Sequence, residues 1–132
     1  MNIATLGPKG QDVVVLAQAC RHASGQEIKE FSSNVSILHE VKGGNKFDLI
    51  FVDIDTSDSG GIPTIIKLAQ YQPSTLIVAI SQHNLGLNNI VEYIWKFIIK
   101  PISVAEIKSI IVKAQQLLAA QLIYLPTNGT RD

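Results

Sequence analysis

Residues 48–55 read Asp-Leu-Ile-Phe-Val-Asp-Ile-Asp, and this stretch decides the class of fold. Its apolar residues form a continuous run, which is typical of a parallel strand buried on both faces of a sheet. We therefore expect a strand over Leu49–Ile54, with the carboxylates of Asp53 and Asp55 at its end. In an open α/β sheet, ligands and chemistry lie at the carboxyl ends of the strands. The stretch thus predicts both a fold class and the place of a functional site.

Further elements follow on both sides of this strand. Short apolar runs predict four more strands: Ile3–Leu6, Glu27–Phe31, Thr75–Ile80 and Trp95–Ile99. Helical spacing of apolar residues predicts the segments between them: Asp12–His22, Ser33–Val41, Ile62–Ala69, Gly86–Tyr93, and a last helix that follows the capping box Ser103-Val104-Ala105-Glu106. Strands that alternate with helices predict a three-layer α/β/α fold around a five-stranded parallel sheet.

Composition narrows the classes of function. The chain has 132 residues, 46% of them hydrophobic, which suits a single folded domain and excludes intrinsic disorder. Eleven Lys and Arg balance 11 Asp and Glu, so the cationic excess that nucleic acid or an anionic membrane attracts is absent. Cys20 is the only cysteine, and neither a signal peptide nor a membrane span is evident. We expect a cytoplasmic protein that binds neither nucleic acid nor membrane.

Polar side chains follow three of the predicted strands. Asp53 ends the third strand, Ser81 the fourth and Lys100 the fifth. A carboxylate, a hydroxyl and an ammonium group at one edge of a sheet form the set that aspartyl-phosphate chemistry requires. Asp53 would be the nucleophile, while Ser81 would hydrogen-bond a phosphoryl oxygen and Lys100 would pair with its charge.

Taken in order, these features resemble the receiver domain of bacterial response regulators. Residues 48–53 match the family's third strand with its phosphoacceptor, and Gly61 falls eight residues later, where the family's loop carries glycine. Ser81 matches the Ser/Thr after the fourth strand, Phe97 the switch aromatic of the fifth, and Lys100-Pro101 the family's Lys-Pro pair.

The resemblance covers roughly residues 1–120 and leaves 121–132 as a C-terminal tail or the stump of a linker. It implies a flavodoxin-like sheet in strand order 2-1-3-4-5 and a cis peptide bond between Lys100 and Pro101. It also implies that Asp53 is the candidate phosphoacceptor and that Ser81 and Phe97 form a switch. The partners it implies are a histidine kinase or an output domain.

One departure from the family concerns the metal site. Receivers carry two adjacent acids after the first strand, which hold Mg²⁺ together with the phosphoacceptor, whereas this chain has Gly7 and Pro8, followed by Lys9. Only Asp53 and Asp55 remain as candidate ligands, and Mg²⁺ is usually held by carboxylates with waters and phosphate. We therefore expect no cofactor, with Mg²⁺ disfavoured and Lys9 a fixed cation in its place.

Such a chain is similar to the pseudo-receivers, which need not be phosphorylated. We expect a degenerate signalling module that acts through protein–protein interaction and is not an enzyme. A functional phosphoacceptor at Asp53 is the alternative. A third hypothesis is a haloacid-dehalogenase-type phosphatase with Asp53 as nucleophile and Asp55 as general acid. It is opposed by the position of the motif on the third strand and by the lack of a downstream acidic pair, since only Glu106 and Asp132 follow Lys100.

The predicted partner surface is the face formed by the fourth helix, the fifth strand and the last helix. The fifth strand would be an edge of the sheet, and unpaired edges invite association. Tyr93, Ile94 and Trp95 precede it, and Val112 lies off the buried stripe of the last helix. Aromatic residues are enriched at interfaces, so a homodimer through this face is a further expectation.

Overall fold

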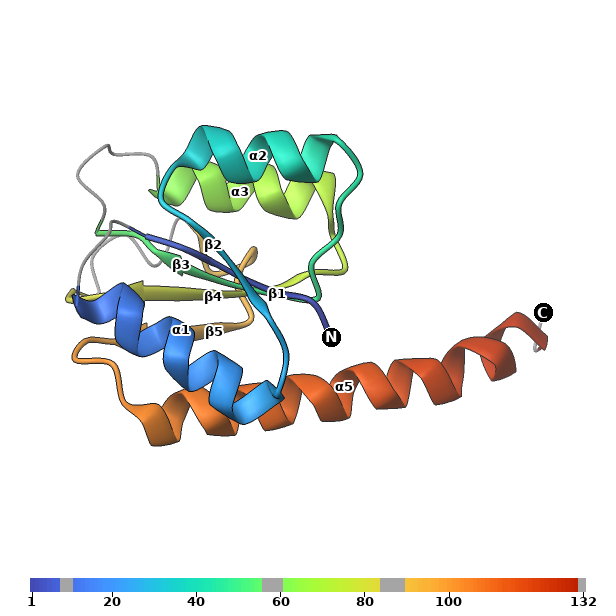
Figure 1. Ribbon diagram of the computed structural model, residues 1–132. Coiled ribbons are helices and arrows are strands. Elements are labelled where there is room, and N and C mark those ends of the chain that lie inside the picture. The colour runs from blue at the N-terminus through green and yellow to red at the C-terminus, as the bar shows by residue number, and fades with distance from the viewer. Residues whose placement is uncertain (8–10, 56–60, 84–89, 131–132) are drawn as a thin grey trace.

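The computed structural model describes residues 1–7, 11–55, 61–83 and 90–130 of the chain. Its strands are β1 (Ile3–Leu6), β2 (Ile28–Phe31), β3 (Leu49–Asp53), β4 (Leu76–Ser81) and β5 (Lys96–Ile99). Its helices are α1 (Gln11–Ser24), α2 (Asn34–Lys42), α3 (Gly61–Tyr71) and α5 (Val104–Thr130) (Figure 1). The predicted strands and these four helices are confirmed, with small differences at their ends. The first half of the helix predicted over 86–93, residues 86–89, falls outside the described residues.

All strand pairs in the sheet are parallel, and the strand order is β2-β1-β3-β4-β5. This confirms the predicted three-layer, flavodoxin-like architecture. In the register of the sheet Asp53 pairs with Ile80, and Ser81 pairs with Ile99. β3, β4 and β5 therefore terminate at the same edge of the sheet, which brings together the polar residues that follow them.

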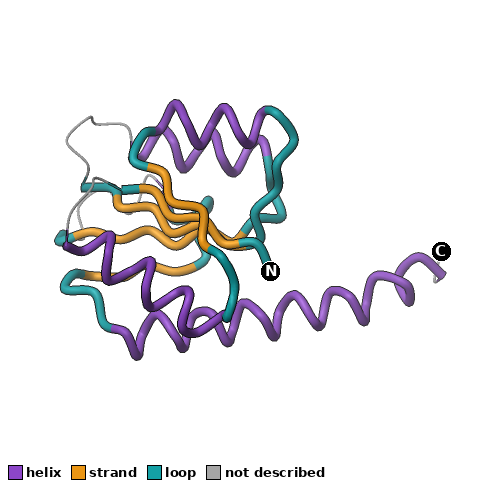
Figure 2. Tube along the Cα trace, viewed as in Figure 1, coloured by secondary structure: helices purple, strands orange, loops and turns teal. Residues whose placement is uncertain are grey.

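The sheet separates two apolar cores, which explains why its central strands lack a polar face. Figure 2 shows the strands between two layers of helices, with α1 and α5 on one side and α2 and α3 on the other. Alternate strand residues serve the two layers: Phe51, Val78 and Ile80 pack with α1 and α5, whereas Val52 and Ala79 pack with α2 and α3. Burial on both faces is the usual condition of an all-parallel sheet.

The last helix begins as its capping sequence predicts, because the hydroxyl of Ser103 accepts the backbone N–H of Glu106 at 3.3 Å. It continues to Thr130 and projects beyond the sheet (Figure 1). The backbone of residues 121–130 is thus helical, in the part of the chain that the sequence predicts to be a C-terminal tail or the stump of a linker. The domain boundary at residue 120 stays a prediction. Within the described residues, no helix has the length and apolar character that crossing a membrane requires.

Candidate functional site

Asp53 ends β3 inside the protein, with only 4% of its surface exposed. Its Oδ2 lies 2.8 Å from Nζ of Lys100, and its Oδ1 accepts the backbone N–H of Asp55 at 2.9 Å. A buried carboxylate requires such compensation, because leaving it without charged or hydrogen-bonding partners would be costly. The carboxylate is therefore paired, with one oxygen held by a cation and the other by the backbone.

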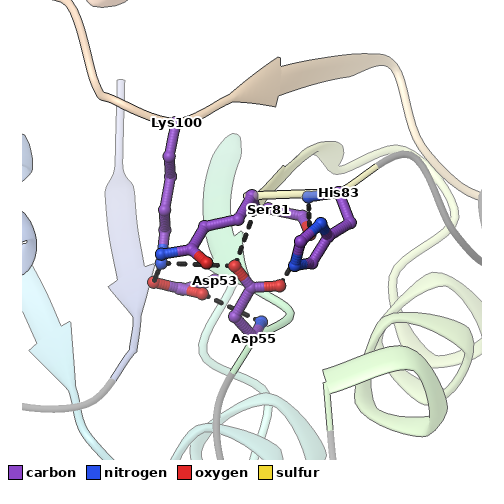
Figure 3. Close-up of polar contacts among 6 residues, drawn as sticks. Asp53, Asp55, Ser81, His83 and Lys100 are labelled. Carbon is purple, nitrogen blue, oxygen red and sulfur yellow. Dashed lines mark hydrogen bonds and ion pairs between the residues drawn. The ribbon is translucent and has the colours of Figure 1, made fainter.

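Lys100 reaches this site from the end of β5 (Figure 3). Its backbone N–H donates to the carbonyl of Ser81 at 2.9 Å, and its bond to Pro101 is cis, as the family resemblance implied. Its Nζ also lies 3.5 Å from Oδ2 of Asp55, so the ammonium contacts both carboxylates. Burial lowers the pKa of Lys100, but the hydrogen bond and charge of Asp53, together with Asp55, outweigh burial and hold that pKa above its usual value.

Ser81 does not hydrogen-bond Asp53 but contacts Asp55. The buried hydroxyl of Ser81 donates to Oδ1 of Asp55 at 2.6 Å, and the backbone N–H of Gln82 donates to Oδ2 at 2.7 Å. The Ser81 oxygen in turn accepts the backbone N–H of His83 at 3.1 Å. Partial burial raises the pKa of Asp55, but the bonds from Ser81 and Gln82 and the charge of Lys100 together bring it below the usual range.

Phe97 lies on β5 beside Ala79 of β4, on the side of the sheet that faces α2 and α3. Its side chain is partly buried and packs against the apolar core of that side. Because residues two apart along a strand share a face, Ser81 points to the same side as Ala79, close to Phe97. The two predicted switch residues are thus neighbours on one face of the sheet, and their coupling stays a prediction.

The end of β1 contributes no carboxylate. Leu6 pairs with Val52, so Gly7 follows at the level of Asp53, and Gly7 N–H donates to the carbonyl of Phe31 at 3.1 Å. Pro8 and Lys9, the predicted fixed cation, lie outside the described residues. Among the residues that the structure describes, no cluster of three or more His, Cys, Asp or Glu could hold a metal ion. Lys100 contacts Asp53 and Ser81 contacts Asp55, the two carboxylates that the sequence leaves as candidate ligands.

Gly61 shows why glycine suits the loop that follows β3. A Cβ at this position would lie 2.7 Å from Cα of Ile54, closer than atoms can approach without displacement. Its missing side chain therefore lets the start of α3 approach the end of β3, next to the site. Packing therefore requires glycine at position 61, because any larger residue would place a Cβ against the backbone of Ile54.

The sequence predicted that Asp53, Ser81 and Lys100 share one edge of the sheet, and the structure brings all three together. The sequence did not predict that Asp55 would accept a hydrogen bond from the Ser81 hydroxyl, because its position suggests only a metal ligand or a general acid. The backbone N–H of Gln82 was also missed, since a main-chain donor leaves no signal in residue type.

Comparison with known proteins gives a consistent result. The sequence profile of the response regulator receiver domain matches residues 12–112. No curated protein sequence matches the chain. The fold resembles the response regulatory domain of protein mrkE from Klebsiella pneumoniae, with a TM-score of 0.82 and 21% identity, over 92% of this chain and 100% of that one.

Two further structures are similar in fold. The first is the N-terminal domain of a response regulator/sensory box/GGDEF 3-domain protein from Carboxydothermus hydrogenoformans, with a TM-score of 0.79, 17% identity and coverage of 92% and 99%. The second is a CheY-like receiver domain protein from Methanospirillum hungatei, with a TM-score of 0.72, 14% identity and coverage of 88% and 95%.

Proposed function

Because the chain belongs to the response regulator receiver domain family, we propose that it is a degenerate receiver that signals by binding a partner protein, without Mg²⁺-dependent phosphorylation of Asp53. The observation that carries this proposal is the end of β1. Gly7 stands level with Asp53 and supplies no carboxylate. Among the residues that the structure describes, the ammonium of Lys100 contacts Asp53 at 2.8 Å.

The chemistry of phosphoryl transfer explains why this matters. Charge on the transferring phosphoryl group is stabilised chiefly by metal ions and fixed cations, and positioning supplies most of the rest. Mg²⁺ prefers near-octahedral oxygen ligands and dehydrates reluctantly. Asp53 is paired with Lys100 and Asp55 is bound to Ser81, so both acids have partners other than a metal, which favours a metal-free state.

A functional phosphoacceptor is the second candidate, and the proximity of Asp53, Ser81 and Lys100 favours it. In that reaction an oxygen of Asp53 attacks the phosphorus of a phosphohistidine or an acyl phosphate. The donor's bond to phosphorus breaks, and the donor leaves with the electron pair of that bond. Lys100 would then balance the charge on the new acyl phosphate.

The geometry gives less support to a phosphatase. A general acid must hold a proton at the working pH. Asp55, the group expected to serve, has its pKa below the usual range despite its partial burial, because Ser81, Gln82 and Lys100 stabilise its charged form. An Asp that is ionised near neutral pH has no proton to donate, so we do not assign hydrolysis to this chain.

The proposed partner is a histidine kinase or an output domain in the cytoplasm, or a second copy of the chain. The surface we assign to it includes β5 and the outer side of α5. Ile99 is 50% exposed and Val112 is 47% exposed, which leaves apolar side chains of both elements at the surface. Trp95, just before β5, is partly buried against the core between the sheet and α1 and α5, so its ring serves packing as well.

A titration with Mg²⁺ tests the proposal. A ligand that binds only the folded state stabilises it by RT ln(1 + [L]/Kd), so millimolar Mg²⁺ should leave this protein's melting temperature nearly unchanged if the site binds the ion weakly. A receiver that retains both acids after its first strand is the positive control. A rise of several degrees that is lost in Asp53→Asn would mean that the site holds metal, and the proposal would then be wrong.

A further inference from the structure

Asp55 lies at a convergence of donors from two strand ends. Its carboxylate accepts the Ser81 hydroxyl at 2.6 Å and the Gln82 backbone N–H at 2.7 Å, both at the end of β4. From the end of β5, Nζ of Lys100 approaches it to 3.5 Å (Figure 3). Hydroxyl, amide and ammonium groups of this kind are the donors that bind an anionic oxygen most strongly when they converge.

These donors are also the ones that a phosphoryl group on Asp53 would need. Asp55 is held beside Asp53, because its own backbone N–H donates to Oδ1 of Asp53 at 2.9 Å. Lys100 contacts both carboxylates, at 2.8 Å and 3.5 Å. The anion next to Asp53 is therefore already present in the unmodified chain, and its hydrogen-bonding partners are in use.

We infer that the Asp55 carboxylate acts as an internal substitute for a phosphoryl group on Asp53. The Asp55 carboxylate holds the Ser81 hydroxyl and the Gln82 backbone N–H at the site. The ends of β4 and β5 therefore keep the arrangement of a site that has bound an anion, without phosphorylation. The inference rests on the proposed function and adds an account of how its site is regulated. Asp55 is a positioning residue, since it acts through Ser81.

The route to the surface runs along one face of the sheet. Ser81 and Phe97 point to the same side of β4 and β5, and Phe97 packs partly into the core there. While Asp55 holds the hydroxyl of Ser81, the ring of Phe97 keeps its packed position. Loss of that bond frees the hydroxyl and changes the balance between ring positions, as a ligand shifts a two-state equilibrium.

The test compares Asp55→Asn and Ser81→Ala with wild type near neutral pH, using NMR signals of the Gln82 amide and of fluorine-labelled Phe97. In Asp55→Asn the Gln82 amide proton should move upfield, because its acceptor loses its charge, and the Phe97 signal should shift or split. Ser81→Ala should shift the Phe97 signal in the same direction. Ser81→Thr, which keeps the hydroxyl, should restore the wild-type signal, and Glu27→Gln, at an exposed acid remote from the site, is the matched control.

The double variant Asp55→Asn with Ser81→Ala should change the Phe97 signal no more than either single variant, because both remove the same bond. If Asp55→Asn does not fold, as shown by a collapsed amide spectrum, the Ser81→Ala and Ser81→Thr pair reports the same bond from its other partner. A Phe97 signal that is unchanged in the folded variants would overturn the inference.

Failure of this inference can be told apart from failure of the proposed function. An unchanged Phe97 signal removes the role of Asp55 but leaves a receiver that is not phosphorylated. Mg²⁺-dependent phosphorylation of wild type would contradict the proposed function, whatever the Phe97 signal shows. It also contradicts the inference, because a phosphoryl group must then displace Asp55 from Ser81 and Lys100.

Discussion

Lys100 is the residue on which the charge balance of the site depends. Its ammonium contacts the buried carboxylate of Asp53 and, more distantly, that of Asp55. The side chains of Lys100 and Asp53 are 12% and 6% exposed, so water screens the pair only weakly. Removing one member of such a pair leaves a buried charge without its counter-ion, which costs more than the pair itself contributes.

Lys100→Met is therefore expected to lower the free energy of unfolding by about 3–5 kcal/mol, the usual cost of breaking a buried ion pair. Chemical denaturation would measure it. Lys113→Met, at an exposed position of α5, should change stability little. The double variant Asp53→Asn with Lys100→Met should recover much of the loss. A Lys100→Met variant as stable as wild type would contradict a buried ion pair between Lys100 and Asp53.

The same site predicts a dependence of stability on pH. Asp55 has its pKa lowered by folding, so its charged form stabilises the native state at neutral pH. That contribution is present above the ordinary Asp pKa of about 4 and is lost as the pH falls through the lower folded value. Lys100 has its pKa raised, so its contribution is present below the ordinary Lys value of about 10.4 and is lost at higher pH.

Comparison of wild type with Asp55→Asn in denaturation experiments across pH would isolate the first effect. The stability difference between them should be constant near neutral pH and shrink as the pH falls below about 4. A difference that grows on acidification would mean that folding raises the pKa of Asp55, contrary to the hydrogen bonds from Ser81 and Gln82.

Among the elements, α5 shows how one helix divides its work. Ile111 is completely buried in the core between the sheet and α1, whereas its neighbour Val112 is 47% exposed on the other side. The helix thus anchors the α1 side of the sheet with one stripe and leaves another for contact with partners. Beyond residue 120 its backbone leaves the sheet behind (Figure 1).

Ile111→Ala should lower the free energy of unfolding by about 2–5 kcal/mol, because it removes buried methyl groups and leaves a cavity. Val112→Ala, one residue away on the same helix, should change it by no more than about 0.5 kcal/mol, as is usual at the surface. Thermal or denaturant unfolding measures both. Equal costs would mean that α5 is rotated from the position described.

How much the sequence predicts depends on the kind of element. The strands were predictable because burial on both faces leaves continuous apolar runs, such as Leu49–Val52. The extension of α5 was not, since Pro126 and the polar residues after it are typical helix-ending signals. The partners of Asp55 were not predictable either. Which carboxylate the Ser81 hydroxyl reaches depends on the register of β3 against β4 and on side-chain rotamers, and residue types specify neither.

At the scale of the whole molecule, the chain is a sheet covered on both faces by helices, with Asp53, Asp55, Ser81 and Lys100 gathered at one edge. Cys20 reports on how tightly one of those faces is closed. It lies in α1, fully buried in the core shared with α5, and burial raises the pKa of its thiol to about 12. Because the thiolate is the reactive form, such a thiol is inert while the core is closed.

Cys20 should therefore react with a thiol reagent in the native protein only at the rate at which the core opens, and rapidly after unfolding in denaturant. Free cysteine, or the unfolded chain at the same pH, gives the reference rate. The destabilising Ile111→Ala variant should react faster than Val112→Ala. Rapid labelling of the native wild type would contradict the closed packing of α1 against α5.

The central claim is that this receiver signals without a phosphoryl group on Asp53, and intact-mass spectrometry after incubation with acetyl phosphate tests it most directly. In the presence or absence of Mg²⁺, the account predicts that the mass of the wild-type chain stays unchanged. A receiver that retains both acids after its first strand should gain one phosphoryl group under the same conditions. A stable, Mg²⁺-dependent gain of one phosphoryl group on wild type that disappears in Asp53→Ala would contradict the account.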